Sequence, residues 1–171
     1  MTENKAIRYE KGKLEELPVI FDLFTQAIRE MLSSKIYQWD EIYPAMDVLT
    51  TDLQNGELYV GKIEGAIAVV FVVNQEYDEE YNNGKWNDTG GGFRIVHRLC
   101  VHPAYQHQGL ARRTMEYIEQ TLHKQEITSI RLDAFSENPF ALRLYNSLDY
   151  KKVGLAKWRK GVFYLMEKMI R

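Results

Sequence analysis

Apolar positions along the chain change their spacing, and each spacing predicts a kind of element. Between Leu14 and Leu32 they recur every three or four residues, which predicts an amphipathic helix. Runs rich in Val, Ile and Tyr predict strands, at 6–9, 57–62, 66–77, 93–101, 129–135, 150–158 and 162–170. Further helices are predicted over 47–54, 109–124 and 139–148, the last capped by Asn138 and beginning at Pro139. The Asn- and Gly-rich stretch 78–92 is predicted to be a long loop.

The order of these elements indicates the fold class. The strands at 57–62 and 66–77 are joined by the short turn Glu64-Gly65, so they should be antiparallel. The strand–helix–strand unit over 93–135 should be parallel and right-handed. We therefore expect a mixed α/β (α+β) fold. Its sheet of six to seven strands has an antiparallel N-terminal part, a parallel central unit and helices on both faces. The length of 171 residues favours a single domain over 1–171.

Composition narrows the function classes. Hydrophobic residues make up 45% of the chain, which is ordinary for a globular protein. A net charge of −2 provides no basic field for nucleic acid or an anionic membrane, so neither is an expected partner. The single cysteine, Cys100, excludes a disulfide within one chain. The N-terminus shows no apolar signal region, and the longest apolar run, 66–73, is too short to span a bilayer. We expect a cytoplasmic protein.

One segment, Gln106–Ala111, carries candidate chemistry because it follows a predicted strand and opens a predicted helix. The first N–H groups of a helix have no partner inside it, and the helix dipole adds positive potential there, so a phosphate suits the place. Gly109 leaves room for that phosphate to approach the backbone. Arg112 and Arg113 oppose the dipole unless a bound anion neutralises them; the alternative is that both lie on a solvated face.

This segment, the preceding Leu99-Cys100-Val101-His102-Pro103 and the later Asn138-Pro139-Phe140-Ala141 with Leu144-Tyr145 resemble the motifs of the GNAT superfamily of N-acetyltransferases. The resemblance covers about 93–150. It implies an enzyme that uses acetyl-CoA and transfers the acetyl group by direct attack to the amine of a small molecule, peptide or protein. A homodimer is also consistent with the family. A non-catalytic acyl-CoA-binding regulatory module stays open as the alternative, because a fold does not determine function.

The resemblance also assigns residues to the cofactor. Leu99, Cys100 and Val101 would hold the pantetheine arm through their backbone, and Asn138 would contact the cofactor from the next helix. The pyrophosphate would lie against the N–H groups of Gln106, His107, Gln108, Gly109, Leu110, Ala111 and Arg112. Two departures from the family pattern are Asp149-Tyr150, where Gly-Phe is frequent, and His107-Gln108, where Arg or Lys is common.

Attack of an amine on a thioester needs a base, an oxyanion donor and an acid for the leaving thiolate. Backbone N–H groups around Leu99–Cys100 are the candidate donors. Tyr145 is the candidate acid, with a core tyrosine as the alternative. His97 is the candidate base, because period-2 counting places it on the same strand face as Leu99. A structural histidine is equally compatible with the pattern, and Glu30 or Asp40 acting through water are weaker candidates for the base.

The segment after the first helix holds candidate substrate residues. By the resemblance, Trp39 and Tyr43 would line the acceptor site; core packing is the alternative. Asp40 and Glu41 favour a cationic amine. The histidines 97, 102 and 107 are five residues apart and no HExxH motif occurs, so no metal is expected.

Overall fold

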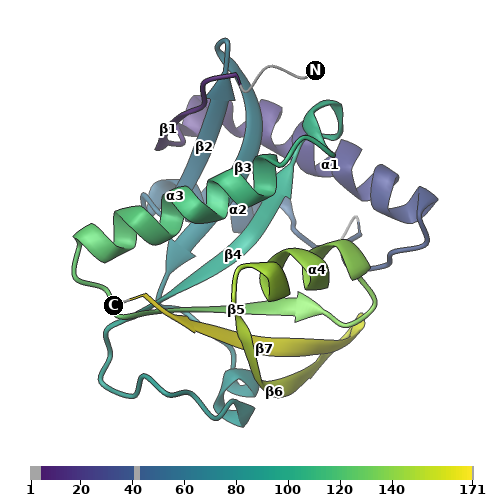
Figure 1. Ribbon diagram of the computed structural model, residues 1–171. Coiled ribbons are helices and arrows are strands. Elements are labelled where there is room, and N and C mark those ends of the chain that lie inside the picture. The colour runs from purple at the N-terminus through teal and green to yellow at the C-terminus, as the bar shows by residue number, and fades with distance from the viewer. Residues whose placement is uncertain (1–4, 41–42, 171) are drawn as a thin grey trace. The chain divides into compact units, whose positions relative to one another are not determined.

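The computed structural model describes residues 5–40 and 43–170. Its strands are β1 (Arg8–Lys11), β2 (Leu58–Ile63), β3 (Ala66–Asn74), β4 (Phe93–Val101), β5 (Ser129–Phe135), β6 (Lys151–Trp158) and β7 (Gly161–Met169). Its α-helices are α1 (Leu17–Ser33), α2 (Met46–Gln54), α3 (Leu110–Lys124) and α4 (Pro139–Ser147). Three short 3₁₀ helices are η1 (Leu14–Glu16), η2 (Glu79–Asn83) and η3 (Pro103–Tyr105). The strands form one mixed sheet in the order β1-β2-β3-β4-β5-β7-β6 (Figure 1). This confirms the predicted fold class and element order.

Some elements differ from the predictions, and the segment after β3 shows why. The strand predicted over 66–77 ends at Asn74, because the side-chain Oδ1 of Asn74 accepts the N–H of Glu76 at 3.0 Å and turns the chain. The stretch predicted as a loop over 78–92 contains η2, whose Tyr81 is only 2% exposed. The turn-forming residues after Tyr77 therefore placed the end of the strand too late, and they did not reveal that η2 holds a buried side chain.

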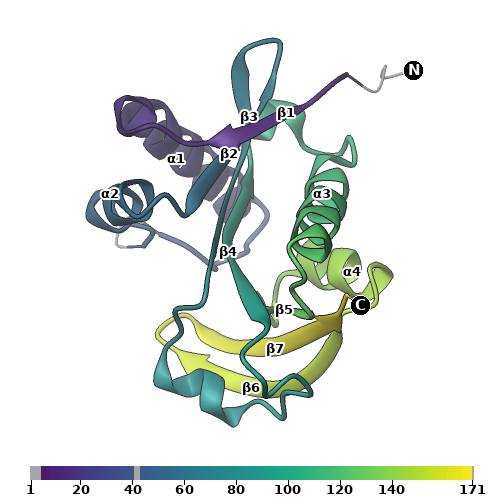
Figure 2. The ribbon, with the colours of Figure 1, turned by 90° about the vertical axis from the view of Figure 1, so that its left-hand side faces the viewer.

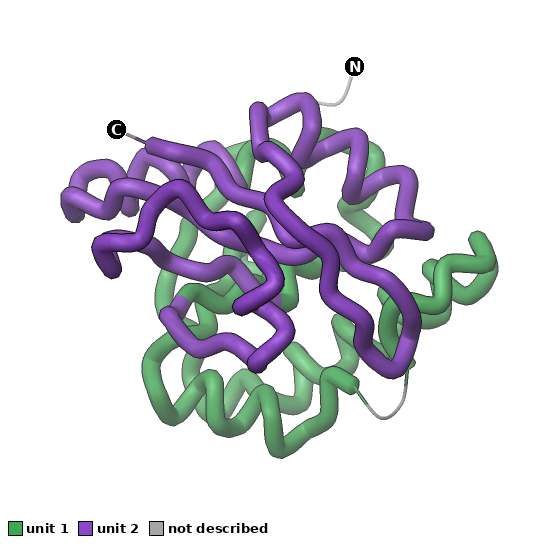
Figure 3. Tube along the Cα trace, turned by 90° about the horizontal axis from the view of Figure 1, so that it is seen from below, with its two compact units in different colours: residues 1–73, 98–114 green, residues 74–97, 115–171 purple. Residues whose placement is uncertain are grey.

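The chain divides into two compact units, residues 1–73 with 98–114 and residues 74–97 with 115–171 (Figure 3). In the first unit β1, β2 and β3 are antiparallel neighbours. Helices α1 and α2 pack on one face of these strands through an apolar cluster that includes Phe24, Leu49, Val70 and Cys100 (Figure 2). On the other face, Leu110 at the start of α3 packs with Ile63, Ala68 and Val69.

In the second unit β4 and β5 are parallel, as predicted, and pair from Phe93↔Ser129 to Ile95↔Arg131. Strand β7 is antiparallel to both β5 and β6. The segment containing η2 lies against β6, on the side away from α4 (Figure 2). It is held by buried polar groups: Glu167 accepts the backbone N–H groups of Asn87 and Asp88 at 2.9 and 3.1 Å. Within residues 5–40 and 43–170, no helix is long and apolar enough to cross a membrane.

Candidate functional site

The turn between β4 and α3 is held by its own hydrogen bonds. The N–H of His102 donates to the carbonyl of Ala68 on β3 at 2.8 Å, which fixes the start of the turn. The ring nitrogen Nδ1 of His102 accepts the N–H of Ala104 at 3.0 Å. The side-chain amide of Gln106 donates to the carbonyl of Val101 at 3.2 Å. Side chains in this turn therefore stabilise its backbone shape.

Gly109 leaves open space beside the turn. Its φ is +73°, and no atom outside its immediate neighbours lies within 4 Å of the position that a Cβ would take. His107 is also left-handed, with φ +62°. The N–H of Arg113 donates to the carbonyl of Gly109 at 3.1 Å, so the N–H groups of Leu110 and Ala111 come too early for a bond within the helix. Unobstructed backbone beside first-turn donors is the geometry that a phosphate group fits.

The start of α3 is anchored to the first unit. Leu110 is 4% exposed, and the partly buried Leu99 and Val101 join its apolar cluster. The hydroxyls of Tyr9 and Thr114 lie 2.9 Å apart, and Arg113 donates to the carbonyl of Lys5 at 2.9 Å. Arg113 thus binds the N-terminal segment, and Arg112 is the exposed arginine of this helical turn.

Strand β4 contains a left-handed residue that the sequence did not reveal. Arg98 has φ +52° within the strand, which interrupts the alternation of faces. Period-2 counting therefore does not hold across Arg98, so it no longer supports the prediction that His97 and Leu99 share a strand face. Beyond Arg98, the thiol of Cys100 points into the core beneath α1 and α2, where burial raises its pKa. Cys100 is a small buried residue, and any role in a site falls to its backbone.

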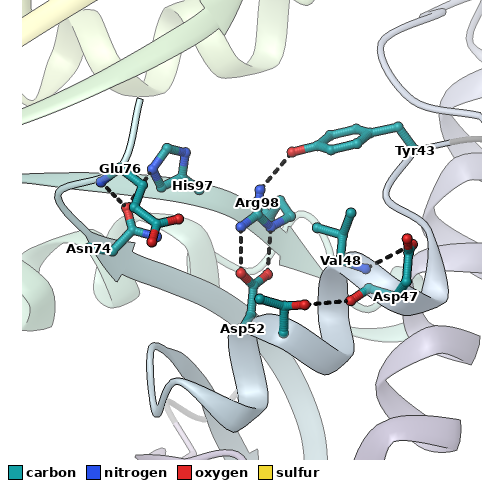
Figure 4. Close-up of polar contacts among 9 residues, drawn as sticks. Tyr43, Asp47, Val48, Asp52, Asn74, Glu76, His97 and Arg98 are labelled. Carbon is teal, nitrogen blue, oxygen red and sulfur yellow. Dashed lines mark hydrogen bonds and ion pairs between the residues drawn. The ribbon is translucent and has the colours of Figure 1, made fainter. Parts of the chain in front are cut away.

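The side chain of Arg98 forms a three-residue cluster with Asp52 and Tyr43 (Figure 4). Its Nε and Nη2 donate to the two carboxylate oxygens of Asp52 at 2.9 and 2.8 Å, and its Nη1 donates to the hydroxyl of Tyr43 at 2.7 Å. The Arg98 and Asp52 side chains are 10% and 9% exposed. Although burial alone would lower it, the pKa of Arg98 is raised by Tyr43 and Asp52. One signal for this cluster was available in the sequence: Asp52 lies on the buried face of α2, beside Leu49 and Leu53.

The two predicted substrate residues differ in their surroundings. Trp39 packs against Phe24 at a ring-centroid distance of 5.5 Å and borders the core cluster, as the core-packing alternative described. Tyr43 is 38% exposed, with its hydroxyl held by Arg98. Asp40 accepts the N–H of Tyr43 at 3.2 Å, and Glu41 lies outside the described residues.

The remaining predicted residues belong to the second unit. Asn138 caps α4 as predicted, with its Oδ1 accepting the N–H of Ala141 at 3.2 Å. Tyr145 is 8% exposed and lies edge-on to Tyr150, with ring centroids 5.7 Å apart. Burial, and then the negative charge of Asp133, raise the pKa of Tyr145 well above its ordinary value. The phenol is therefore protonated throughout the physiological pH range and can act as a donor.

His97 contacts Asn74 at the end of β3. Its Nε2 lies 2.9 Å from the Oδ1 of Asn74 (Figure 4). The structure thus brings the turn residues 99–112 together in one unit and His97, Asn138 and Tyr145 in the other. Within the described ranges, no group of three or more His, Cys, Asp or Glu side chains is arranged to hold a metal ion.

Comparison with known proteins finds acetyltransferases by sequence and by structure. The model of the acetyltransferase (GNAT) family matches residues 22–150. An uncharacterized N-acetyltransferase of Bacillus subtilis, YesJ, is 28% identical over 120 residues; the match covers 68% of this chain and 66% of that protein, just under two thirds. A GNAT-family acetyltransferase from Streptococcus agalactiae aligns with a TM-score of 0.82 at 21% identity, over 98% of this chain and 99% of that one. The PaiA N-acetyltransferase of Thermoplasma acidophilum was solved in complex with coenzyme A. It aligns with a TM-score of 0.70 at 13% identity, over 96% of this chain and 99% of that one.

Proposed function

Because the chain belongs to the acetyltransferase (GNAT) family, we propose that it transfers the acetyl group of acetyl-CoA to an amine by direct attack. The observation that carries the proposal is the turn at Gly109, where left-handed backbone, open space and first-turn N–H groups occur together. The proposal treats 1–171 as one acyl-CoA N-acyltransferase domain. It takes the acceptor to be the amine of a small molecule, a peptide or a protein.

The cofactor residues follow from the same turn. The N–H groups of residues 106–112 would hold the pyrophosphate, and the backbone of 99–101 would hold the pantetheine arm. Asn138 would contact the cofactor from the start of α4. Coenzyme A is present in one aligned structure. Its acetylated form, acetyl-CoA, would supply the thioester whose carbonyl carbon reacts with the amine. Arg112, exposed in the first turn of α3, would partly neutralise the phosphates.

Three groups of this chain would then carry the chemistry. His97 takes a proton from the amine, so that the nitrogen lone pair can form the C–N bond. Backbone N–H groups at Leu99–Cys100 donate to the carbonyl oxygen as negative charge develops on it. Tyr145 donates its hydroxyl hydrogen bond to the sulfur as the C–S bond breaks. Because the raised pKa of Tyr145 makes full transfer to a thiolate uphill, its effect comes from a hydrogen bond formed in the transition state.

Two measurements test this function. Calorimetry with coenzyme A should show binding, and acetyl-CoA should raise the melting temperature. A thiol-reactive dye should then detect coenzyme A release with at least one amine of a panel: spermidine, an aminoglycoside, an amino-acid amide, and peptides with a free N-terminus or a lysine. Buried Cys100, with its raised pKa, should add little background to the dye signal. Binding without release across the panel would favour the regulatory module. No coenzyme A binding at millimolar concentration would refute both.

A further inference from the structure

The hydrogen bond between Asn74 and His97 determines which ring nitrogen can act as the base. Asn74 ends β3, and its Oδ1 lies 3.0 Å from the N–H of Glu76 and 2.9 Å from the Nε2 of His97 (Figure 4). The oxygen and nitrogen of an asparagine amide are distinguished by their hydrogen-bond partners. A backbone N–H can only donate, so the atom of Asn74 that faces Glu76 is the oxygen.

The assignment of the Asn74 oxygen also determines the tautomer of His97. A carbonyl oxygen can only accept, so the Nε2 of His97 must carry the hydrogen in their shared bond. In the neutral imidazole the lone pair is then on Nδ1, which is the nitrogen able to take a proton. The reverse tautomer would place a lone pair on Nε2 against the Asn74 oxygen. Flipping the amide would instead set its NH₂ against the N–H of Glu76, leaving donors face to face.

We infer that Asn74 is a positioning residue of the transfer reaction, which holds His97 in the Nε2–H tautomer so that Nδ1 receives the proton of the acceptor amine. The inference rests on the proposed function for the role of His97, but the tautomer itself is a property of the protein alone. Asn74 acts through His97 and makes no contact with substrate in this account. Its backbone partner, Glu76, makes the arrangement independent of any bound ligand.

Four charged residues lie near His97 or Asn74 along the chain or on the strand paired with β4. Glu76 follows β3, and Arg98 is the next residue on β4. On β5, which pairs with β4, Arg131 is opposite Ile95, and Asp133 accepts the hydroxyl of Tyr81 at 2.6 Å. None of the four is itself replaced in the Asn74 variants. Asn74→Asp keeps an acceptor for the N–H of Glu76, so a change in proton affinity of His97 in that variant reports on position 74.

Nitrogen-15 NMR of the imidazole rings tests the tautomer directly, without substrate. At mildly alkaline pH, His97, assigned by its absence in His97→Gln, should show a protonated Nε2 and an unprotonated Nδ1. His123 is the internal control, because its Nδ1 lies 2.6 Å from the carbonyl of Ile170 and must carry the hydrogen. The two histidines should therefore show opposite patterns in one spectrum. A protonated Nδ1 on neutral His97 would overturn the inference, while coenzyme A binding, and with it the proposed function, would stand.

Two variants then test the role in turnover, with the amine that the panel identifies. Asn74→Asp keeps the acceptor and adds a negative charge that favours the imidazolium, so the acid limb of the kcat/KM profile should move up by about one pH unit. Asn74→Leu removes the acceptor and should lower kcat about tenfold, the low end for lost orientation of a working imidazole. Neither should change coenzyme A affinity more than about twofold.

Gln75→Leu is the matched control at the same strand end. Gln75 donates to the carbonyls of Gly91 and Phe93, both at 3.0 Å, so its loss removes two hydrogen bonds without touching the His97 contact. This variant should keep the wild-type tautomer and pH profile. An Asn74→Asp protein with an unshifted acid limb would contradict the inference, and so would an Asn74→Leu protein that retains the tautomer and kcat.

Discussion

The turn before α3 and Arg98 lie a few residues apart in the chain, yet the turn presents backbone groups and the Arg98 cluster consists of side chains. The turn presents backbone N–H groups around Gly109, and its side chains bond inward to their own loop. The cluster presents a guanidinium held by a carboxylate and a phenol, all of them side chains. A backbone site tolerates exchange of most side chains but not a changed backbone conformation. A side-chain site is instead lost when one of its side chains is exchanged. The same holds for the proposed roles of His97 and Tyr145.

The largest expected effect is on stability, at the buried ion pair. Asp52→Ala leaves the Arg98 charge without its carboxylate at a side chain that is 10% exposed, which should lower the free energy of unfolding by about 3–5 kcal/mol. Urea denaturation measures this. Asp47→Ala on the same helix is the control. Its exposed carboxylate accepts the N–H of Val48, and the loss should be about 0.5 kcal/mol. Equal losses in the two variants would show that the Arg98 cluster contributes nothing specific.

Next comes Tyr145, the proposed hydrogen-bond donor to the leaving sulfur. Tyr145→Phe keeps the ring and deletes the hydroxyl, so kcat should fall about 100-fold where chemistry limits the rate, with little change in acetyl-CoA affinity. Tyr150→Phe is its neighbour and control, because it loses a 3.1 Å hydrogen bond to Glu119. That variant should lose about 1 kcal/mol of stability and keep kcat. A Tyr145→Phe protein with wild-type kcat would return Tyr145 to a packing role.

Gly109→Val tests the backbone site. The valine side chain would enter the space beside the turn at a φ that L-residues disfavour, and coenzyme A affinity should fall tenfold or more, about 1.4 kcal/mol. Gly65→Val is a close match: its φ is +83° and its Cβ position is equally open, but it lies in the β2–β3 turn. Both variants carry similar backbone strain, so only the first should lose affinity. Calorimetry measures the coenzyme A affinity of both variants. If the two affinities are equal, the phosphates bind elsewhere.

The smallest effect should come from removing a side chain of the same turn. Gln106→Ala deletes the bond to the Val101 carbonyl, which should cost about 1 kcal/mol of stability. Coenzyme A affinity should stay within about threefold, because the proposed donors are backbone groups. A loss above tenfold, with the fold intact by circular dichroism, would mean that side chains carry the recognition and would remove the contrast between the two regions.

Sequence alone was sufficient for features that depend on residues near each other in the chain. The strand–helix order, the Asn138 cap and the glycine at the start of α3 were all readable, because periodicity, capping and backbone freedom act over a few residues. The end of β3 at Asn74 was missed, although its cause is also local. A strand propensity running through Val72 to Tyr77 concealed a side-chain turn.

Tertiary structure decided the side-chain partnerships. Arg98 and Asp52 are 46 residues apart in the sequence, and His97 and Asn74 are 23 apart. Neither contact can therefore be predicted from the spacing of residues along the chain. The left-handed Arg98 is likewise invisible in a strand of ordinary composition, yet it changes which residues share a face. The sequence determined the order of the elements and the place of the turn that is proposed to bind phosphate. Which side chains meet, and which nitrogen of His97 carries its hydrogen, depends on how distant strands and helices bring single donors and acceptors within bonding distance.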